Sequence, residues 1–283
     1  MAISVVLPAK NESGAIGHTI EKILQLQLVD EIVVVNDGST DNTRDIAEQA
    51  GAKVITHPYS KGNGAAIKTG ARNATGDIIV FMDADGQHDP NDIPKLLIEI
   101  EQGYDLVVGA RQKGSQASLG RGIANGLYNG LASYMTEQKV EDLTSGFRAV
   151  RAEKFSEYLY LLPNGFSYPT TSTMAFFRAG YSVTYVPIQA AKRIGKSHIQ
   201  PLKDGIRFFL IIFKIATLFS PLKMFLPISV FLFLIATSWY VYTLLEYGRF
   251  TNMSALLYTG SVMIFLMGLI SEQITALMYK DNK

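Results

Sequence analysis

The sequence has no cysteine. Disulfide bonds, thiolate metal sites and cysteine nucleophiles are therefore excluded, although the redox compartment stays open. An excess of charge of either sign is also missing, because 26 lysines and arginines stand against 25 aspartates and glutamates. No bulk electrostatic attraction to nucleic acid is expected. The N-terminus shows no basic leader, long apolar run or cleavage site, so we expect no signal peptide and a cytosolic first domain.

Long uncharged apolar runs are confined to the part of the chain after about residue 205. The run at 222–245 carries one charge, Lys223, and the run at 254–278 carries one, Glu272. Each can cross about 30 Å of hydrocarbon at about 1.5 Å per residue; a pair of core helices is the alternative. Basic residues flank the hairpin, so both of its ends are expected on the cytoplasmic side. We expect Glu272 to make a packing or oligomer contact rather than to act in catalysis.

A basic stripe that includes Lys203, Arg207 and Lys214 precedes the hairpin, on a helix whose remaining surface is apolar. The pattern predicts a helix in the headgroup plane of a membrane; a core helix with solvated lysines is the alternative. The expected parts are a cytosolic domain at 1–200, an interfacial amphipathic helix at 201–220 and a transmembrane hairpin with a short cytosolic tail at 221–283.

In the first part, short β-branched runs alternate with helical stretches. The predicted strands lie at 3–7, 31–35, 53–56, 78–82 and 106–108, and the predicted helices at 15–26, 43–51, 65–74 and 93–102. Strict alternation implies right-handed crossovers and a mainly parallel α/β sheet. Because ligands bind beyond the carboxyl ends of such strands, the polar segments that follow them form the candidate site.

The strongest signal of this kind follows the fourth predicted strand, where Asp83 and Asp85 are separated by one residue and Gln87 comes two residues later. Two carboxylates and the Gln87 carbonyl suit a hard divalent ion, Mg²⁺ or Mn²⁺, whose shell a diphosphate can complete. Taken alone, Asp-x-Asp is a weak motif, because it also occurs in ordinary turns and helix caps.

Three further polar turns follow strands at the same predicted edge. Asp37 is placed to accept hydrogen bonds from a nucleobase or ribose, whereas Asp41 can cap the helix that begins at Thr43. The segment 8–12 closes the first strand, and 61–64 opens a helix whose N-terminus could face an anion. Four such turns on one rim favour a ligand site over isolated caps.

Together these segments resemble inverting family 2 glycosyltransferases of GT-A fold, of the dolichol-phosphate mannose synthase and bacterial polyprenyl-phosphate glycosyltransferase type. The resemblance spans nearly the whole chain and rests on VLPAKNE at 6–12, VNDGSTD at 35–41, KGNGAA at 61–66, DADGQH at 83–88 and DLTSGFR at 142–148. It implies a Rossmann-like GT-A domain that transfers a sugar, with inversion, from a nucleotide-sugar to undecaprenyl or dolichyl phosphate.

The resemblance also implies roles for single residues. The nucleotide would be held by Pro8, Ala9, Glu12, Asp37, Lys61, Gly62 and Asp83, and the metal by Asp83, Asp85 and Gln87. The catalytic set would comprise Asp85, Arg121 and Asp142, the last in a positioning role, and phosphates would be reached by Arg111 and Arg121. The family often has two aspartates in the turn at 35–41, and here the first is Asn36.

A basic loop immediately precedes the predicted interfacial helix. At headgroup height it could position a lipid phosphate through Arg193, Lys196 and His198; nonspecific attraction to anionic lipid is the alternative. The family commonly has a lysine in place of His198. A phosphate monoester with a second pKa near ~6 is already ionised at neutral pH, so the acceptor needs no general base. The metal and Arg121 would stabilise the departing diphosphate.

Several points stay open at the level of sequence. Analogy with two-helix bacterial relatives favours a UDP-sugar, and GDP-mannose is the alternative donor. A processive polysaccharide synthase would carry a Gln-x-x-Arg-Trp element, yet the one tryptophan, Trp239, lies in the first apolar run. An inactive membrane scaffold of the same fold is a further alternative, and the membrane helices could pair copies of the chain.

Overall fold

The computed structural model describes residues 1–112, 119–165, 167–190, 213, 217 and 219–280, with the backbone alone at 119–124, 279 and 280. The chain forms two compact units, Met1–Ile199 and Gln200–Lys283. The basic loop at 193–198 and most of the helix predicted at 201–220 lie outside the described residues.

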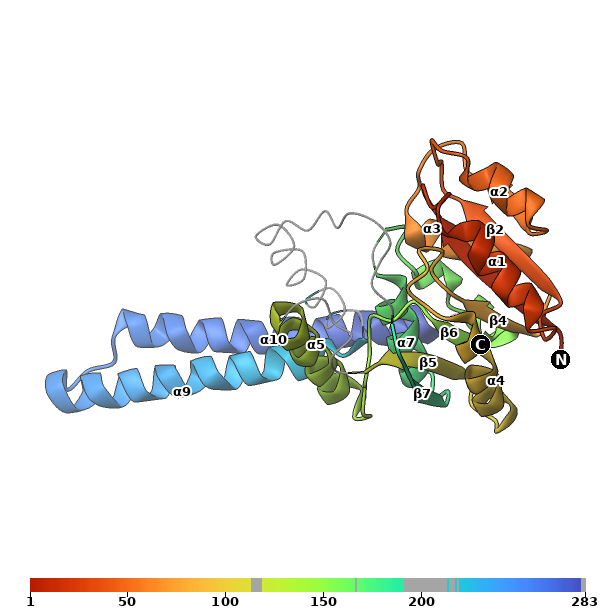
Figure 1. Ribbon diagram of the computed structural model, residues 1–283. Helices are drawn as coiled ribbons and strands as arrows, with labels where there is room; N and C mark the ends of the chain where they lie inside the picture. Colours follow the sequence, from red (N-terminus) through yellow and green to blue (C-terminus); the bar gives the residue numbers. More distant parts are fainter. Residues whose placement is uncertain (113–118, 166, 191–212, 214–216, 218, 281–283) are drawn as a thin grey trace. The chain divides into compact units, whose positions relative to one another are not determined.

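The first unit is built on a seven-stranded sheet (Figure 1). Its strands are β1 (Ile3–Ala9), β2 (Glu31–Asn36), β3 (Lys53–Thr56), β4 (Ile78–Phe81), β5 (Leu106–Arg111), β6 (Arg148–Arg151) and β7 (Val183–Ile188), in the spatial order β3-β2-β1-β4-β6-β5-β7. Neighbouring strands are parallel except that β6 runs antiparallel to both β4 and β5. The predicted mainly parallel sheet is therefore confirmed.

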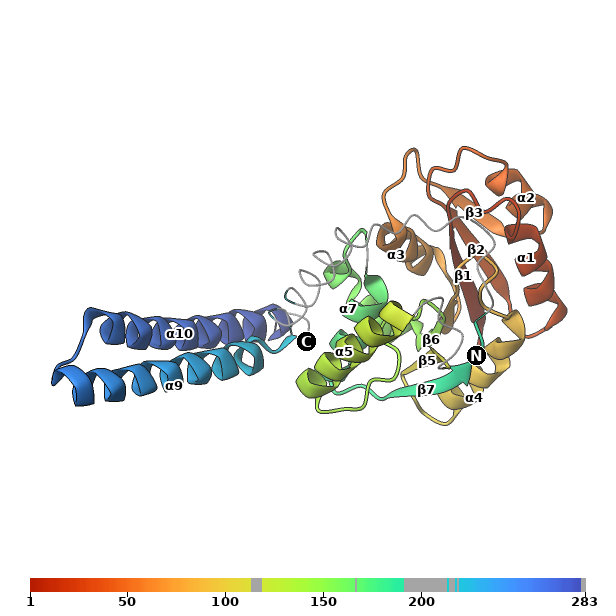
Figure 2. The ribbon, with the colours of Figure 1, turned by 60° about the vertical axis from the view of Figure 1, so that its left-hand side comes forward.

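Helices cover both faces of the sheet. In Figure 2, one side of the sheet carries α1 (Ile16–Gln25), α2 (Thr43–Gln49) and α4 (Ile93–Glu101), and the other side carries α3 (Asn63–Asn73) and α7 (Tyr168–Arg178). The remaining helical segments of this unit are α5 (Leu119–Thr136), α6 (Ala152–Ser156), η1 (Pro90–Asp92) and η2 (Leu159–Leu161). The side chains of successive strand residues point to opposite faces, so each helical layer packs on its own set of strand residues.

The cores of both faces follow from the spacing of apolar residues. In α1, Ile16, Ile20 and Ile23 recur at helical intervals and are fully buried, in one cluster with Val5 and Leu7 of β1. On the other face, Gly70 lets α3 approach β1 closely, because a Cβ at this position would collide with the side chain of Val6. This close packing fixes where the loops at the carboxyl ends of β1, β2 and β4 can lie.

The second unit is a hairpin of α9 (Pro221–Tyr247) and α10 (Asn252–Lys280). Both helices are long and apolar enough to cross a membrane, with mean hydropathy 1.9, and only 11% and 17% of their most apolar windows are buried. Gly248 ends α9 in the left-handed conformation, with φ of 59°, which glycine adopts without steric cost. The apolar runs predicted at 222–245 and 254–278 are thus helical throughout.

Polar contacts hold the two helices of the hairpin together. The hydroxyl of Ser229 donates to the carbonyl oxygen of Ser261 at 2.9 Å, and the hydroxyl of Ser261 donates to the carbonyl oxygen of Ser229 at 3.0 Å. Glu272 accepts a hydrogen bond from the backbone N–H of Leu222 at 3.2 Å. Because the first N–H groups of a helix lack partners within the helix, this bond gives Glu272 the packing contact that its position predicts.

Candidate functional site

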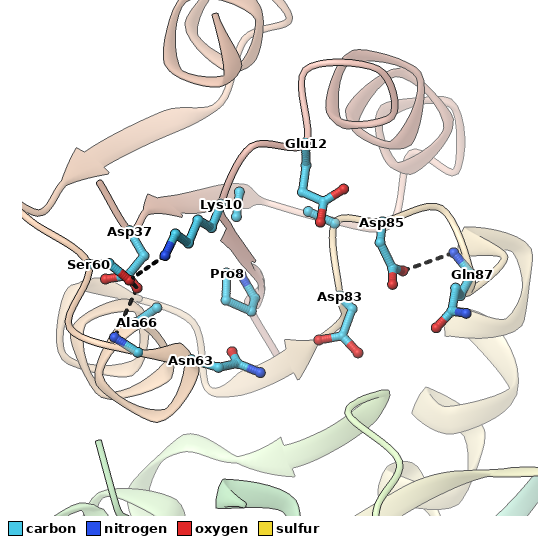
Figure 3. Close-up of a pocket in the computed structure, with 13 residues that line it drawn as sticks. Pro8, Lys10, Glu12, Asp37, Ser60, Asn63, Ala66, Asp83, Asp85 and Gln87 are labelled. Atoms are coloured by element: carbon cyan, nitrogen blue, oxygen red, sulfur yellow. Dashed lines mark hydrogen bonds between the residues drawn. The ribbon is translucent and has the colours of Figure 1, made fainter. Parts of the chain in front are cut away.

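A pocket of about 520 Å³ lies where β1, β2 and β4 end (Figure 3). Of the residues singled out in the sequence, its lining includes Pro8, Ala9, Glu12, Asp37, Gly62, Asp83, Asp85 and Gln87. Of the other lining residues, Lys10, Asn63, Ala66 and Ala84 lie within the motif segments but were given no role, and Ser60 lies outside those segments. The expected gathering of polar turns at one edge of the sheet is therefore observed, whereas the role of each residue stays a prediction.

Asp37 is buried, and both oxygens of its carboxylate are engaged by the segment that follows β3. Its Oδ1 receives hydrogen bonds from His57 Nδ1 at 2.7 Å and the Lys61 N–H at 2.8 Å. Its Oδ2 receives them from the Ser60 hydroxyl at 2.8 Å and the Gly62 N–H at 2.9 Å. We call these five residues the Asp37 cluster. A carboxylate has about four acceptor positions, so a direct contact with a nucleobase would have to replace one of these bonds.

These hydrogen bonds also set the ionisation of Asp37. Burial would raise the pKa of its carboxyl, but the bonds from His57, Lys61, Gly62 and Ser60 outweigh burial and lower the pKa to about 2. The group is therefore a carboxylate at any physiological pH. Because it is an acceptor only, His57 carries its proton on Nδ1 and presents Nε2 to the Thr69 hydroxyl of α3, 2.9 Å away.

Most backbone donors at the N-terminus of α3, where the sequence predicts that an anion could bind, have partners within the chain. The N–H of Gly64 donates to the carbonyl oxygen of Gly165 at 3.2 Å, and the N–H of Ala65 donates to that of Asn164 at 2.9 Å. The N–H groups of Lys61 and Gly62 bind Asp37, as described. These four donors are thus used within the chain, and an anion contact at this end of α3 stays a prediction. The side chain of Lys61 points to the ring of Tyr59, 5.8 Å from its centre, and Lys61 does not line the pocket.

The acidic loop, residues 83–87, forms the opposite side of the pocket from Asp37 (Figure 3). Asp85 accepts a hydrogen bond from the backbone N–H of Gln87 at 3.1 Å, while Asp83 has no hydrogen-bond partner among the described residues. No group of three or more His, Asp or Glu side chains in the described part of the chain could hold a metal. Two carboxylates and one amide fit a divalent ion that takes its other ligands from a diphosphate and water.

His88 follows the acidic loop and was not singled out from the sequence. Its side chain is 6% exposed and stacks on Phe147, with ring centroids 5.3 Å apart. Its Nδ1 is buried and has no hydrogen-bond partner in the described residues. The stacking ties the acidic loop to the segment that precedes β6.

Arg111, at the end of β5, is paired with Asp142. Arg111 Nε donates to Asp142 Oδ2 at 2.8 Å, and Nη2 donates to Oδ1 at 2.9 Å and to the Thr144 hydroxyl at 2.6 Å. Burial would raise the pKa of Asp142, but the hydrogen bonds and positive charge of Arg111 hold it below its ordinary value. The two N–H groups of Arg111 Nη1 have no partner among the described residues, which leaves them for an anion.

The other predicted phosphate contacts fall outside what the structure describes. Arg121 lies on α5, of which only the backbone is described at that position, and Arg193, Lys196 and His198 lie outside the described residues. The pocket, the Arg111–Asp142 pair and the acidic loop are thus the described elements of the site.

Two family models match this chain. Residues 4–159 match glycosyl transferase family 2, and residues 220–277 match the GtrB C-terminal hairpin. The chain is 32% identical over 206 residues to a dolichyl-phosphate hexose transferase of Haloferax volcanii, a match that covers 72% of this chain and 89% of the relative.

The chain is also similar to a second lipid-phosphate transferase and to a solved structure. It is 33% identical over 161 residues to an undecaprenyl-phosphate 4-deoxy-4-formamido-L-arabinose transferase of Proteus mirabilis, and the match covers 53% of this chain and 48% of that protein. The chain thus spans about half of that transferase. A structure of glucosyl-3-phosphoglycerate synthase from Mycobacterium tuberculosis with Mn²⁺, uridine diphosphate and phosphoglyceric acid has a TM-score of 0.60 and 27% identity, covering 75% of this chain and 78% of the synthase. This likeness confirms the expected GT-A fold.

Proposed function

Because the chain belongs to glycosyl transferase family 2, we propose that it transfers a sugar, with inversion, from a nucleotide-sugar to the phosphate of a polyprenyl lipid. The observation that carries this proposal is one pocket that joins the acidic loop to the Asp37 cluster, in a chain that continues into an apolar hairpin. The names of the Haloferax and Proteus relatives support the lipid acceptor.

The donor would occupy the pocket with its nucleoside toward the Asp37 cluster and its diphosphate toward the acidic loop. Pro8 and Glu12 line the pocket and would contact the nucleoside, and Asp37 would act by fixing the segment 57–62 against the pocket. The mycobacterial synthase was crystallised with uridine diphosphate, which supports a UDP-sugar over GDP-mannose here.

Asp83, Asp85 and Gln87 would hold a divalent ion, Mg²⁺ or Mn²⁺. When bound, the ion would neutralise negative charge that develops on the departing nucleotide diphosphate. The Mn²⁺ in the mycobacterial synthase supports this assignment. The chain itself contributes the two carboxylates in a pocket already formed, so little reorganisation is needed when the donor binds.

The acceptor phosphate would approach Arg111. Asp142 fixes the guanidinium of Arg111 by two parallel hydrogen bonds, so that Nη1 is aimed without loss of side-chain entropy at the moment of binding. The acceptor is ionised near neutral pH and attacks without a general base, and Asp142, paired with an arginine, serves positioning alone. Arg121 and the loop of Arg193, Lys196 and His198 would supply further positive charge.

The hairpin would place this chemistry at a membrane. We propose that α9 and α10 span the cytoplasmic membrane, with the first unit and both termini in the cytosol and the segment 201–220 in the headgroup plane. Basic residues on both flanks of the hairpin and few in its connector support this orientation. Pairing of copies through these helices is compatible with the arrangement.

A donor screen tests the proposal. Membranes that contain the full chain would be incubated with radiolabelled nucleotide-sugars, undecaprenyl or dolichyl phosphate, and Mg²⁺ or Mn²⁺. We expect label in the lipid fraction with one donor, and loss of that label when EDTA removes the metal. Transfer to no lipid with any donor would favour an inactive scaffold, and a labelled polymer would favour a processive synthase.

A further inference from the structure

Arg148, the first residue of β6, is a fully buried cation beside the pocket. Its side chain is 0% exposed, and its guanidinium lies over the ring of Tyr168, 5.5 Å from the centre. Its hydrogen bonds go to the carbonyl oxygen of Pro169 at 2.9 Å, to two hydroxyls of α7 and to the carbonyl oxygen of Ser145. Among the described residues no carboxylate pairs with it, although Asp142 and Asp83 lie within electrostatic range.

Arg148 and Tyr168 hold two successive carbonyl groups. Arg148 Nη2 donates to the carbonyl oxygen of Ser145, and the Tyr168 hydroxyl donates to that of Gly146 at 2.8 Å. Tyr168 is 2% exposed and lies in the first turn of α7. The carbonyl groups of residues 145 and 146 are thus held in place by two buried side chains that do not line the pocket.

Gly146 in turn lies directly against Asp83. A Cβ built on Gly146 would lie 2.7 Å from Asp83 Oδ2 and 3.2 Å from both Asp83 Cγ and Oδ1. Asp83 has no hydrogen-bond partner in the described residues, and the space on this side of its carboxylate is bounded by Gly146.

We propose that Gly146 and Tyr168 are positioning residues for Asp83: the Tyr168 hydroxyl holds the Gly146 backbone as a wall, and this wall directs the Asp83 carboxylate toward a divalent ion. The inference rests on the proposed function, because that function assigns Asp83 to a metal. Outer groups that orient a metal ligand commonly change metal affinity by about 10-fold to 100-fold when they are removed.

The first test is Gly146→Ala. The added methyl group meets the free end of a side chain, so Asp83 turns away while the backbone of β6 keeps its place. The concentration of free Mn²⁺ would be measured by electron paramagnetic resonance during a titration of the full chain, in detergent micelles at a fixed concentration of uridine diphosphate. The affinity for Mn²⁺ follows from this titration. We expect Mn²⁺ affinity to fall by about 10-fold or more. Gly130→Ala is the matched control, because no atom lies within 4 Å of a Cβ at this helical position.

The second test is Tyr168→Phe, which removes the hydroxyl and keeps the ring beside Arg148. We expect a smaller loss of Mn²⁺ affinity, about 3-fold to 10-fold, with the KM for polyprenyl phosphate unchanged. Tyr181→Phe is the control of the same chemical type, because the Tyr181 hydroxyl bonds to Glu157 at 2.8 Å and Tyr181 does not line the pocket.

The outcomes separate this inference from the proposed function. Wild-type affinity for Mn²⁺ in both Gly146→Ala and Tyr168→Phe overturns the inference and leaves the function in place. A wild-type chain that binds Mn²⁺ but transfers no sugar overturns the function, while the two variants still test the wall. A wild-type chain that binds no Mn²⁺ with uridine diphosphate overturns the inference together with the metal assignment.

Discussion

Arg111 holds Asp142 through two parallel hydrogen bonds, Nε to Oδ2 at 2.8 Å and Nη2 to Oδ1 at 2.9 Å. Asp142 is 5% exposed and its pKa lies below the ordinary value, so it remains a carboxylate at neutral pH and is a poor proton acceptor there. The pair therefore presents Arg111 as an oriented cation, and Asp142 is not suited to act as a general base.

We predict that Asp142→Asn lowers kcat/KM for the lipid acceptor by about 10-fold to 100-fold, because a mispositioned Arg111 costs that much. The shape of the pH profile should not change. In both proteins the rate should fall below about pH 6, where the acceptor phosphate gains a proton. The control is Glu141→Gln, at an exposed neighbour that is paired with Lys139. If the fall in rate at acidic pH disappeared only in Asp142→Asn, Asp142 would be identified as a general base.

Asp85→Asn should lower transfer on the order of 10²-fold or more, since the ion would lose a charged ligand. The thermal unfolding temperature should stay near that of the wild type, because Asp85 bonds the N–H of Gln87 through an oxygen that asparagine keeps. Asp89→Asn is the control in the same segment: Asp89 caps the short helix η1 and does not line the pocket. Equal turnover in wild type and Asp85→Asn would remove the metal assignment.

Asp37→Asn should destabilise the first unit in a pH-dependent way. The pKa of Asp37 is lowered from 3.8 to about 2, so its carboxylate stabilises the fold fully above the unfolded-state value, and this stabilisation is lost as the pH falls toward 2. The shift corresponds to about 2 kcal/mol.

Calorimetry of the full chain in detergent between pH 7 and pH 3 checks this expectation. The gap in unfolding temperature between wild type and Asp37→Asn should be constant above about pH 5 and should narrow below about pH 4. Asp45→Asn, at an exposed site on α2, should leave the unfolding temperature nearly unchanged throughout. A gap that widens in acid would contradict the role of the Asp37 cluster.

Ser229 and Ser261 should stabilise the hairpin jointly. Each hydroxyl donates to the backbone carbonyl of the other serine, which alanine keeps, so Ser229→Ala and Ser261→Ala should each remove one bond. Each variant should lower the free energy of unfolding in sodium dodecyl sulfate by about 0.6 kcal/mol, the average for hydrogen bonds between membrane helices. Ser238→Ala is the control, because the Ser238 hydroxyl bonds within its own helix to the carbonyl oxygen of Leu234. A free energy of unfolding equal to that of the wild type in both variants would show that the contact contributes nothing.

The sequence predicted those parts of the fold that are marked by local patterns. The first five strands and four helices were predicted within a few residues, except that β5 continues to Arg111, because β-branched runs and apolar helical spacing are read locally. Strand β6 was missed, since its four residues begin and end with arginine and offer no apolar run. Strand β7 was missed because Pro187 interrupts it, and a proline is tolerated there at the edge of the sheet.

The site shows the same division between local and distant information. Asp83, Asp85 and Asp37 stand directly after strands, and the sequence placed them on the rim where the pocket is found. His57 follows β3 on the same rim and could have been found by the same rule. By contrast, the N–H groups of Gly64 and Ala65 in α3 donate to the carbonyl oxygens of Gly165 and Asn164, about a hundred residues away. No sequence pattern near α3 predicts partners this far away in the chain.

The reversed direction of β6 has a consequence for how the site could evolve. A strand that runs with its neighbours delivers the loop after it to the rim, whereas β6 delivers the loop before it. The stretch from Asp142 to Phe147, which precedes β6, therefore contacts Arg111 and Asp83. On its N-terminal side, the loop that contains this stretch begins where α5 ends. Insertions and deletions between α5 and Asp142 would thus change the surroundings of Arg111 while leaving the loops after the parallel strands β1, β2 and β4 unaltered.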